Sequence, residues 1–298
     1  MFRFVIYAAL LALTAFTPHS LRAAPLVEVT ALSTGTAPGI IVDIRAPEDY
    51  AAGHVPGAVN APYPLWRGPA ENPGRALDDE ALTSLLRSLG ISEDARVTIA
   101  YQGRNATDFG AAARVYWTLK SAGLTDLAIL NGGVEAWAEA GLPLSTDAPA
   151  IAPSTITVSL SPQWMMTRDE VADVVAGRSN ARMIDARPLD FFEGRKKHSA
   201  ATEAGTLKGA LNVIHSSWFG ENEQRMNASP EAIRSILASA GYEGELNPDE
   251  TLVSFCNTGH WAATNWFALS EIAGIENVKL YPESLVGWTN AGGDVVAQ

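Results

Sequence analysis

Residues 41–47 read IVDIRAP, and the same pattern returns at residues 183–188 as MIDARP. Three more segments recur in the same order, so the chain carries an internal repeat. They are AGHVPGAVN (52–60) with AGTLKGALN (204–212), Val97–Tyr101 with Thr251–Phe255, and VEAW (134–137) with LVGW (285–288). The offset is 142 residues at Asp43 and Asp185 and 152 at Gly57 and Gly209, which places an insertion in the second copy at Glu193–Glu203. The repeat predicts a duplicated domain.

Short β-branched runs alternate with helical stretches in each copy, a pattern typical of a parallel sheet flanked by helices on both faces. The expected strands are Ile40–Ile44, Val97–Tyr101, Ala128–Leu130, Met183–Ala186, Thr251–Phe255 and Val278–Tyr281. The expected helices are Ala81–Leu89, Ala111–Ala122, Pro230–Ala240 with Ser229 as its N-cap, and Ala262–Ala273. The predicted fold is α/β, with tandem domains at 25–147 and 157–298 joined by a Pro- and Ala-rich linker at 148–156.

Composition removes several classes of function. With 21 Lys and Arg against 33 Asp and Glu in 298 residues, the net charge is −12, which argues against binding to a nucleic-acid backbone. The single cysteine, Cys256, rules out an internal disulfide and a Cys-rich zinc site. Because the sequence contains no metal-ligand or phosphate-loop motif, we expect no metal, nucleotide or other cofactor.

The N-terminus has the layout of a secretory signal. Arg3 precedes an apolar run, Phe4–Phe16, and the small residues Ala23 and Ala24 follow. The run of 13 residues is shorter than the roughly 17–25 that a permanent membrane-spanning helix needs. We expect residues 1–24 to be a cleaved signal peptide and the mature protein to be exported, in the periplasm, with no membrane partner. An uncut N-terminal anchor is the alternative.

Cys256 follows an expected strand and precedes an expected helix, the place where ligands bind in open parallel sheets. It opens the loop Cys256–Trp261, which reads CNTGHW. Successive backbone N–H groups in such a loop form a nest for an anion and stabilise a thiolate. The alternative is a small buried core residue. Because the first copy has Gln102 at the matching position, only the second domain is expected to be catalytic.

The duplicated units, the Asp-x-Arg strand ends, the GHVPGA box at 53–58 and the six-residue cysteine loop resemble the tandem-domain rhodanese family of sulfurtransferases. The resemblance implies that Cys256 takes a sulfane sulfur from thiosulfate or a 3-mercaptopyruvate-type donor and becomes a persulfide. It further implies transfer of that sulfur to cyanide or another thiophilic acceptor, an inactive N-terminal domain, and a donor-binding arginine at Arg195. The loop has neither the cations of thiosulfate enzymes nor the Gly and Ser of mercaptopyruvate enzymes, so the donor stays open.

An acidic chain needs local cations to bind an anionic sulfur donor. Arg195 is preferred for this role because it lies in the insertion, whereas Lys196 and Lys197 are more typical of a solvated turn. Arg187 is open between donor binding and a structural role, because Arg45 occupies the same place in the first copy.

The loop residues after the cysteine are also candidates for donor binding. Asn257, Thr258 and Gly259 are expected to act through their backbone N–H groups. His260 is open between a donor contact and a solvent-facing position, and Trp261 between a pocket wall and simple packing.

The predicted function is an exported sulfurtransferase that works by a ping-pong mechanism on a small anionic donor and a thiophilic acceptor. One alternative is a sulfur carrier that delivers persulfide sulfur to a protein thiol. Another keeps the chemistry with 3-mercaptopyruvate as the main donor. A cysteine-dependent phosphatase or arsenate reductase is disfavoured, because the loop is one residue short and lacks a closing arginine.

Overall fold

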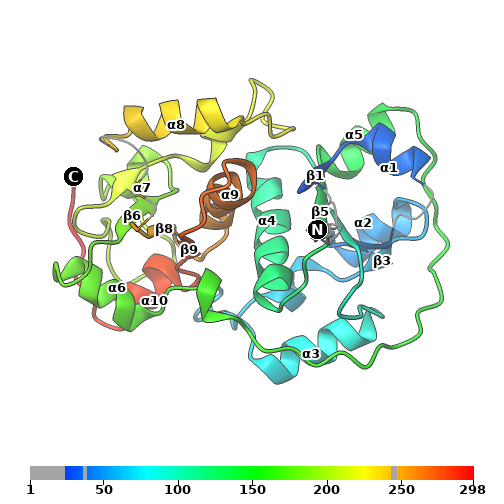
Figure 1. Cartoon of the computed structure of the whole chain (residues 1–298), viewed down its shortest axis with the longest axis horizontal. Helices are drawn as coiled ribbons and strands as arrows, with labels where there is room; N and C mark the ends of the chain where they lie inside the picture. The colour runs from blue at the N-terminus through cyan, green and yellow to red at the C-terminus, as the bar shows by residue number, and fades with distance from the viewer. Residues whose placement is uncertain (1–23, 36–38, 243–246, 248) are drawn as a thin grey trace, which may run out of the picture.

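The computed structural model describes residues 24–35, 39–242, 247 and 249–298, arranged as two lobes (Figure 1). The predicted signal peptide lies outside the described residues, except for Ala24. In the part that is described, no helix combines the length and the apolar character needed to span a bilayer.

Each lobe is built on one parallel sheet, with strand order β1-β5-β4-β2-β3 in the first domain and β7-β6-β8-β9 in the second. The first domain contains β1 (Leu26–Val27), α1 (Val29–Thr34), β2 (Ile40–Asp43), α2 (Pro47–Ala52), β3 (Val59–Asn60), the 3₁₀ turn η1 (Tyr63–Trp66), α3 (Asp79–Ser88), β4 (Val97–Ala100), α4 (Ala106–Ser121), β5 (Leu127–Leu130) and α5 (Gly133–Glu139). The second contains η2 (Pro162–Trp164), α6 (Arg168–Val175), β6 (Arg182–Asp185), α7 (Leu189–Phe192), β7 (Leu211–Asn212), η3 (His215–Trp218), α8 (Pro230–Ser239), β8 (Leu252–Phe255), α9 (Trp261–Phe267), η4 (Ala268–Ile272), β9 (Val278–Leu280) and α10 (Ser284–Asn290). The predicted α/β fold with two parallel sheets is confirmed.

The expected long elements are present, with ends displaced by a few residues. Ser229 caps α8 as predicted, because its hydroxyl accepts a hydrogen bond from the Ala232 N–H at 3.2 Å. The helix expected at Ala262–Ala273 differs in its second half, where α9 gives way to the π-helical segment η4.

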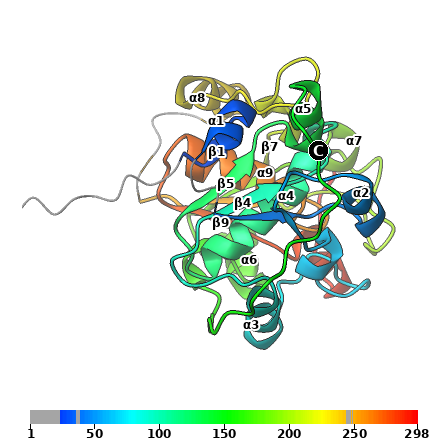
Figure 2. The same ribbon diagram turned by 90° about the vertical axis from the view of Figure 1, so that its right-hand side faces the viewer.

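Helices cover both faces of each sheet. In the first domain α1, α2 and α5 pack on one face, and α3 and α4 on the other; Figure 2 shows α1 and α5 on one side of β4 and β5 and α3 on the other. In the second domain α6, α7 and α10 cover the outer face, and α8 and α9 the inner one. The inner layers of both domains belong to one hydrophobic core.

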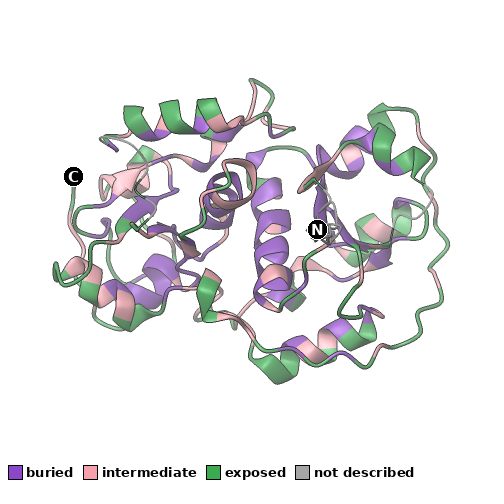
Figure 3. Ribbon diagram, in the orientation of Figure 1, coloured by how far each residue is buried: buried purple, intermediate pink, exposed green. Residues whose placement is uncertain are grey.

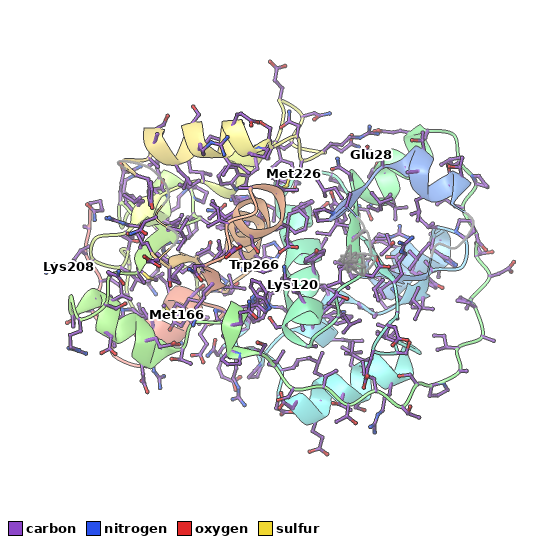
Figure 4. All side chains as sticks on the ribbon, in the orientation of Figure 1. Glu28, Lys120, Met166, Lys208, Met226 and Trp266 are labelled. Carbon is purple, nitrogen blue, oxygen red and sulfur yellow. The ribbon has the colours of Figure 1, made fainter. Side chains whose placement is uncertain are left out.

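The two domains meet where α4 packs against α9 at the centre of the molecule (Figure 1). The Phe267 ring of α9 meets Phe109 and Tyr116 of α4 edge-on, with ring centroids 5.5 and 5.0 Å apart. Lys120 of α4 places its ammonium 5.6 Å from the centre of the Trp266 ring (Figure 4). Because α4 is packed against its own sheet and against α9, it is buried along most of its length (Figure 3).

Strand register corrects one equivalence between the two copies. Asp43 pairs with Ala100 as Asp185 pairs with Phe255, so the next residues, Tyr101 and Cys256, occupy the same place. The predicted match of Gln102 to the cysteine is therefore wrong by one position, because similarity between the loops does not fix the alignment as the hydrogen-bonded ladder does. The first domain has a buried tyrosine where the second has its cysteine.

The repeated Asp-x-Arg motif ties each strand end to a later loop. Arg45 pairs with the Asp43 carboxylate at 2.6 Å and donates to the Gly53 carbonyl at 2.8 Å. Arg187 repeats both contacts in the second domain at the same distances. Since all four charged groups are buried, removal of one partner leaves an uncompensated charge in the interior.

Replacement of Asp43 by Asn is expected to lower the free energy of unfolding by about 3 kcal/mol, because the buried Arg45 charge loses its counter-ion. Urea denaturation followed by tryptophan fluorescence measures the change. Asp126→Asn is the matched control, because it breaks the half-exposed pair with Arg96 and should cost less than about 1 kcal/mol. Equal losses in the two variants would contradict the structural role assigned to the motif.

Candidate active site

Cys256 borders a cavity that residues of both domains line. The residue follows β8 directly and is 1% exposed, but it lines a cavity of about 490 Å³. The cavity is lined by Tyr63, Pro64, Arg67, Gly68, Pro73 and Thr107 of the first domain and by His198, Cys256, Asn257, Thr258, His260 and Trp261 of the second. Cys256 thus belongs to the buried core and also borders a cavity that residues of both domains line.

Ser284 at the start of α10 holds the cysteine loop in shape. Its hydroxyl accepts hydrogen bonds from the N–H groups of Cys256 at 3.0 Å and Gly259 at 3.1 Å, and donates to the Tyr281 carbonyl at 2.9 Å. Ser284 has a φ of +51°, in the left-handed region that favours glycine. The corresponding residue of the first domain is Gly133, with a φ of +63°. A serine kept in a strained conformation points to a functional requirement for the hydroxyl.

Gly259 allows the loop to lie close to the first domain. Its φ is +66°, and a Cβ atom there would come within 2.4 Å of both the Arg114 guanidinium and the Pro282 carbonyl oxygen. A larger residue would displace the loop from the neighbouring domain.

Three amides of the loop are available to a ligand. Within the described residues, no protein group accepts a hydrogen bond from the backbone N–H of Asn257, Thr258 or His260. The loop carbonyls of Cys256 and Asn257, in contrast, accept hydrogen bonds from the α10 amides. This asymmetry is that of a loop prepared for an anion.

Arg67 brings a cation from the first domain to the cavity. Its guanidinium donates to the Tyr63 hydroxyl, to the Thr258 carbonyl at 2.9 Å and to the Pro73 carbonyl at 2.7 Å. In the part of the chain that the structure describes, Arg67 forms no ion pair with a carboxylate. Its positive charge is therefore available to bind an anion in the cavity.

Arg114 of α4 lies behind the loop and is fully buried. It donates to the carbonyls of Gly259 at 3.3 Å and Gly74 at 2.8 Å, while its Nε has no acceptor among the described groups. Burial, and then the charge of Arg67, lowers the pKa of Arg114 to about 9. A negative charge at the loop, such as a Cys256 thiolate, opposes this shift.

His260 connects the loop to the first domain as a neutral ring. Its Nε2 lies 2.8 Å from the Thr107 carbonyl and therefore carries the hydrogen, so Nδ1 accepts from the Tyr63 hydroxyl at 2.9 Å. Burial, followed by the charge of Arg67, lowers the pKa of His260 to about 3. The side chain lines the cavity without adding a positive charge at neutral pH.

The family model for the rhodanese-like domain matches the chain twice, at residues 28–140 and 167–291. The chain belongs to the rhodanese family. A Saccharopolyspora erythraea protein named "Putative thiosulfate sulfurtransferase" is 30% identical over 253 residues, with 82% of this chain and 83% of that protein covered. The "Sulfur carrier protein TtuD" of Thermus thermophilus is 26% identical, with 84% and 87% covered.

The crystal structure of SseA from Escherichia coli, a 3-mercaptopyruvate sulfotransferase, is similar with a TM-score of 0.72 at 23% identity. That match covers 88% of this chain and 98% of SseA, so the two share the tandem rhodanese fold. With its named relatives, the family makes the protein a sulfurtransferase.

The structure of this rhodanese brings most of the predicted site residues together. Asn257, Thr258, His260 and Trp261 line the cavity with the cysteine, and Gly259 lies behind them. Trp261 stacks on His215 with ring centroids 4.7 Å apart and forms a wall of the cavity.

The two predicted arginines do not line this cavity. Arg187 pairs with Asp185 and donates to the Gly205 carbonyl, and its Nη1 lies 3.4 Å from the Asn257 Oδ1. Arg195 points outward, 57% exposed, and pairs with carboxylates next to it in the chain. The expected donor contact of Arg195 is corrected accordingly, because nearby acids hold its guanidinium at the surface.

Sequence reasoning missed the cations that the first domain supplies. Arg67 ends the η1 turn at the position where the second copy has Phe219, and Arg114 lies in the middle of an apolar helix. The signal was present as a difference between the copies. That difference alone does not show that the two side chains reach the other domain's site, because their position depends on how the domains pack.

Replacement of Ser284 by Gly copies the first domain at this position. We expect kcat/KM for sulfur transfer to fall about tenfold or more, because the Cys256 and Gly259 amides lose their common acceptor. Stability should change by less than about 1 kcal/mol, since relief of the positive φ offsets the lost hydrogen bonds. Steady-state kinetics and urea denaturation give the two values.

Ser284→Ala is the matched control, because it removes the hydroxyl but keeps the backbone strain. It should lose activity to the same extent and be less stable than the glycine variant. Full activity in either variant would show that the hydroxyl does not organise the loop.

Proposed function

We propose that this rhodanese takes the sulfane sulfur of thiosulfate onto Cys256 and passes it to cyanide or a thiol. The observation that carries the proposal is the cavity in which the only thiol of the chain lies near two arginines that form no ion pair with a carboxylate of the described chain. A nucleophilic sulfur beside unbalanced positive charge suits an anionic sulfur donor.

Two displacements complete one turnover. The Cys256 thiolate attacks the outer sulfur of thiosulfate, an S–S bond forms to the protein, and the S–S bond of the donor breaks to release sulfite with its two negative charges. The protein then carries a persulfide anion. An acceptor nucleophile attacks the terminal sulfur, and the S–S bond of the persulfide breaks. The acceptor leaves as thiocyanate or as an organic persulfide, and the Cys256 thiolate is regenerated.

The positive charges near Cys256 favour a dianionic sulfur donor. The chain has a net charge of −12, so a dianion approaches against the overall field. Arg67 at the cavity wall and Arg114 behind the loop oppose this repulsion locally. The free amides of Asn257, Thr258 and His260 add hydrogen-bond donors for the oxygen atoms of the leaving sulfite.

Export and the acceptor are part of the same proposal. The signal-like N-terminus supports a periplasmic enzyme, as the sequence predicts. The similarity to TtuD supports the alternative of a sulfur carrier with a protein thiol as acceptor, and the similarity in fold to SseA keeps 3-mercaptopyruvate as an alternative donor. One panel of assays compares these alternatives. It measures sulfur loading of Cys256 by thiosulfate and by 3-mercaptopyruvate, and then sulfur release to cyanide, small thiols or a protein thiol.

Incubation of the purified protein with thiosulfate is expected to add one sulfur atom at Cys256, because the residue lines the cavity and Arg67 beside it can bind the anion. Intact-protein mass spectrometry measures the gain, and cyanide should remove it with formation of thiocyanate. Cys256→Ser is the control and should gain nothing. A wild-type protein that stays unmodified by thiosulfate and by 3-mercaptopyruvate contradicts the proposal.

Replacement of Arg67 by Ala is expected to raise the KM for thiosulfate about tenfold or more, because the dianion loses a direct cationic partner. Steady-state kinetics measure KM, with Arg234→Ala, which removes an exposed arginine of α8, as the control. Arg195→Ala tests the sequence prediction against the structure, since its exposed position predicts an unchanged KM. An unchanged KM in Arg67→Ala would contradict a role of the first domain in thiosulfate binding.

A further inference from the structure

The insertion (residues 193–203) is the part of the second domain that has no counterpart in the first. Its three cations do not line the cavity. Arg195 and Lys196 pair with Asp190 at 2.8 and 2.7 Å and are mostly exposed, and Lys197 donates to the Ala201 carbonyl. Its histidine, His198, does line the cavity with Cys256. The basic run thus brings an imidazole, rather than a cation, to the site.

His198 is held in a fixed turn. Its Nδ1 accepts a hydrogen bond from the Ala200 N–H at 3.2 Å, and its carbonyl accepts one from the Ala201 N–H at 2.9 Å. The turn is tied to α10, because the Asn290 side chain donates to the Ala200 carbonyl at 2.9 Å. The same helix begins at Ser284, so one element positions both the cysteine loop and the histidine.

The occupied Nδ1 determines which ring nitrogen carries the hydrogen. In the neutral ring Nε2 must be the N–H, and no acceptor for it exists among the described groups of the protein. Burial, and then the charge of Arg67, lowers the pKa of His198, which favours the uncharged ring. The cavity therefore holds one N–H donor from the insertion and a guanidinium from the first domain.

We propose that His198 is a donor-binding residue whose Nε2–H contacts an oxygen atom of the anionic sulfur donor while Arg67 binds the same anion from the other domain. The inference rests on the proposed function and names a residue that recognises its substrate. A dianion between Arg67 and His198 accepts hydrogen bonds from both side chains. The neutral His198 ring adds a directional hydrogen bond to the anion without adding a second positive charge. Because the first domain lacks the insertion, it lacks this contact as well as the nucleophile.

Two substitutions separate the substrate contact from the turn. In His198→Asn, the side-chain oxygen can still accept the Ala200 N–H, but the donor at the Nε2 position is lost. In His198→Gln, the longer amide can return an N–H donor toward that position. Lys196→Ala, which removes an exposed cation of the same insertion, is the matched control.

The asparagine variant is expected to lower kcat/KM for thiosulfate about tenfold, with kcat/KM for cyanide unchanged, because only the first half-reaction uses the contact. The glutamine and Lys196 variants should stay close to wild type. Thiosulfate kinetics unaffected in His198→Asn, or an equal loss for donor and acceptor, overturns the inference.

The wild-type protein separates this inference from the proposed function. Wild type that gains sulfur from thiosulfate, together with a His198→Asn protein that gains it with the same concentration dependence, overturns only the role of His198. Wild type that gains no sulfur overturns the proposed function and this inference with it. Circular dichroism and urea denaturation confirm that the compared proteins are equally folded.

Discussion

The packing of α4 against α9 is the contact on which the rest of the molecule depends. It joins the inner helical layers of the two sheets into one core, and it holds the first domain beside the Cys256–Trp261 loop. α4 also carries Arg114, so the helix that provides the apolar contact provides a buried charge behind Gly259. If the two domains were free to move apart, neither Arg67 nor Arg114 would have a defined position relative to the thiol.

The two copies share a frame and differ where chemistry requires it. The Asp-x-Arg pair and the parallel ladder are reproduced almost contact for contact. The differences concentrate around one cavity: Tyr101 against Cys256, and Gly133 against Ser284. The domain without a nucleophile is therefore not a passive remnant, because it supplies the cationic wall of its partner's site.

Most of the fold follows from sequence, because repeats, strand-like runs and caps are local signals. The repeat predicted two parallel sheets, and Ser229 predicted the start of a helix. Cys256 and its loop were found for the same reason, since a strand end followed by a polar loop is visible along the chain. Residues that reach the site from the other domain, such as Arg67, could not be placed, because their position depends on how the domains pack. Arg195 was misplaced because the sequence shows its charge but not that nearby carboxylates hold it at the surface.

Ser284 has a consequence for how the two halves could have diverged. A thiol introduced at Tyr101 would lie in a loop whose support is Gly133, which has no hydroxyl to gather the amides. That half also has no counterpart of the turn that contains His198, so a single substitution at Tyr101 would not reproduce the surroundings of Cys256. The surroundings of Cys256 are thus spread over α10, the insertion and the neighbouring domain, so the two halves share a fold without sharing a site.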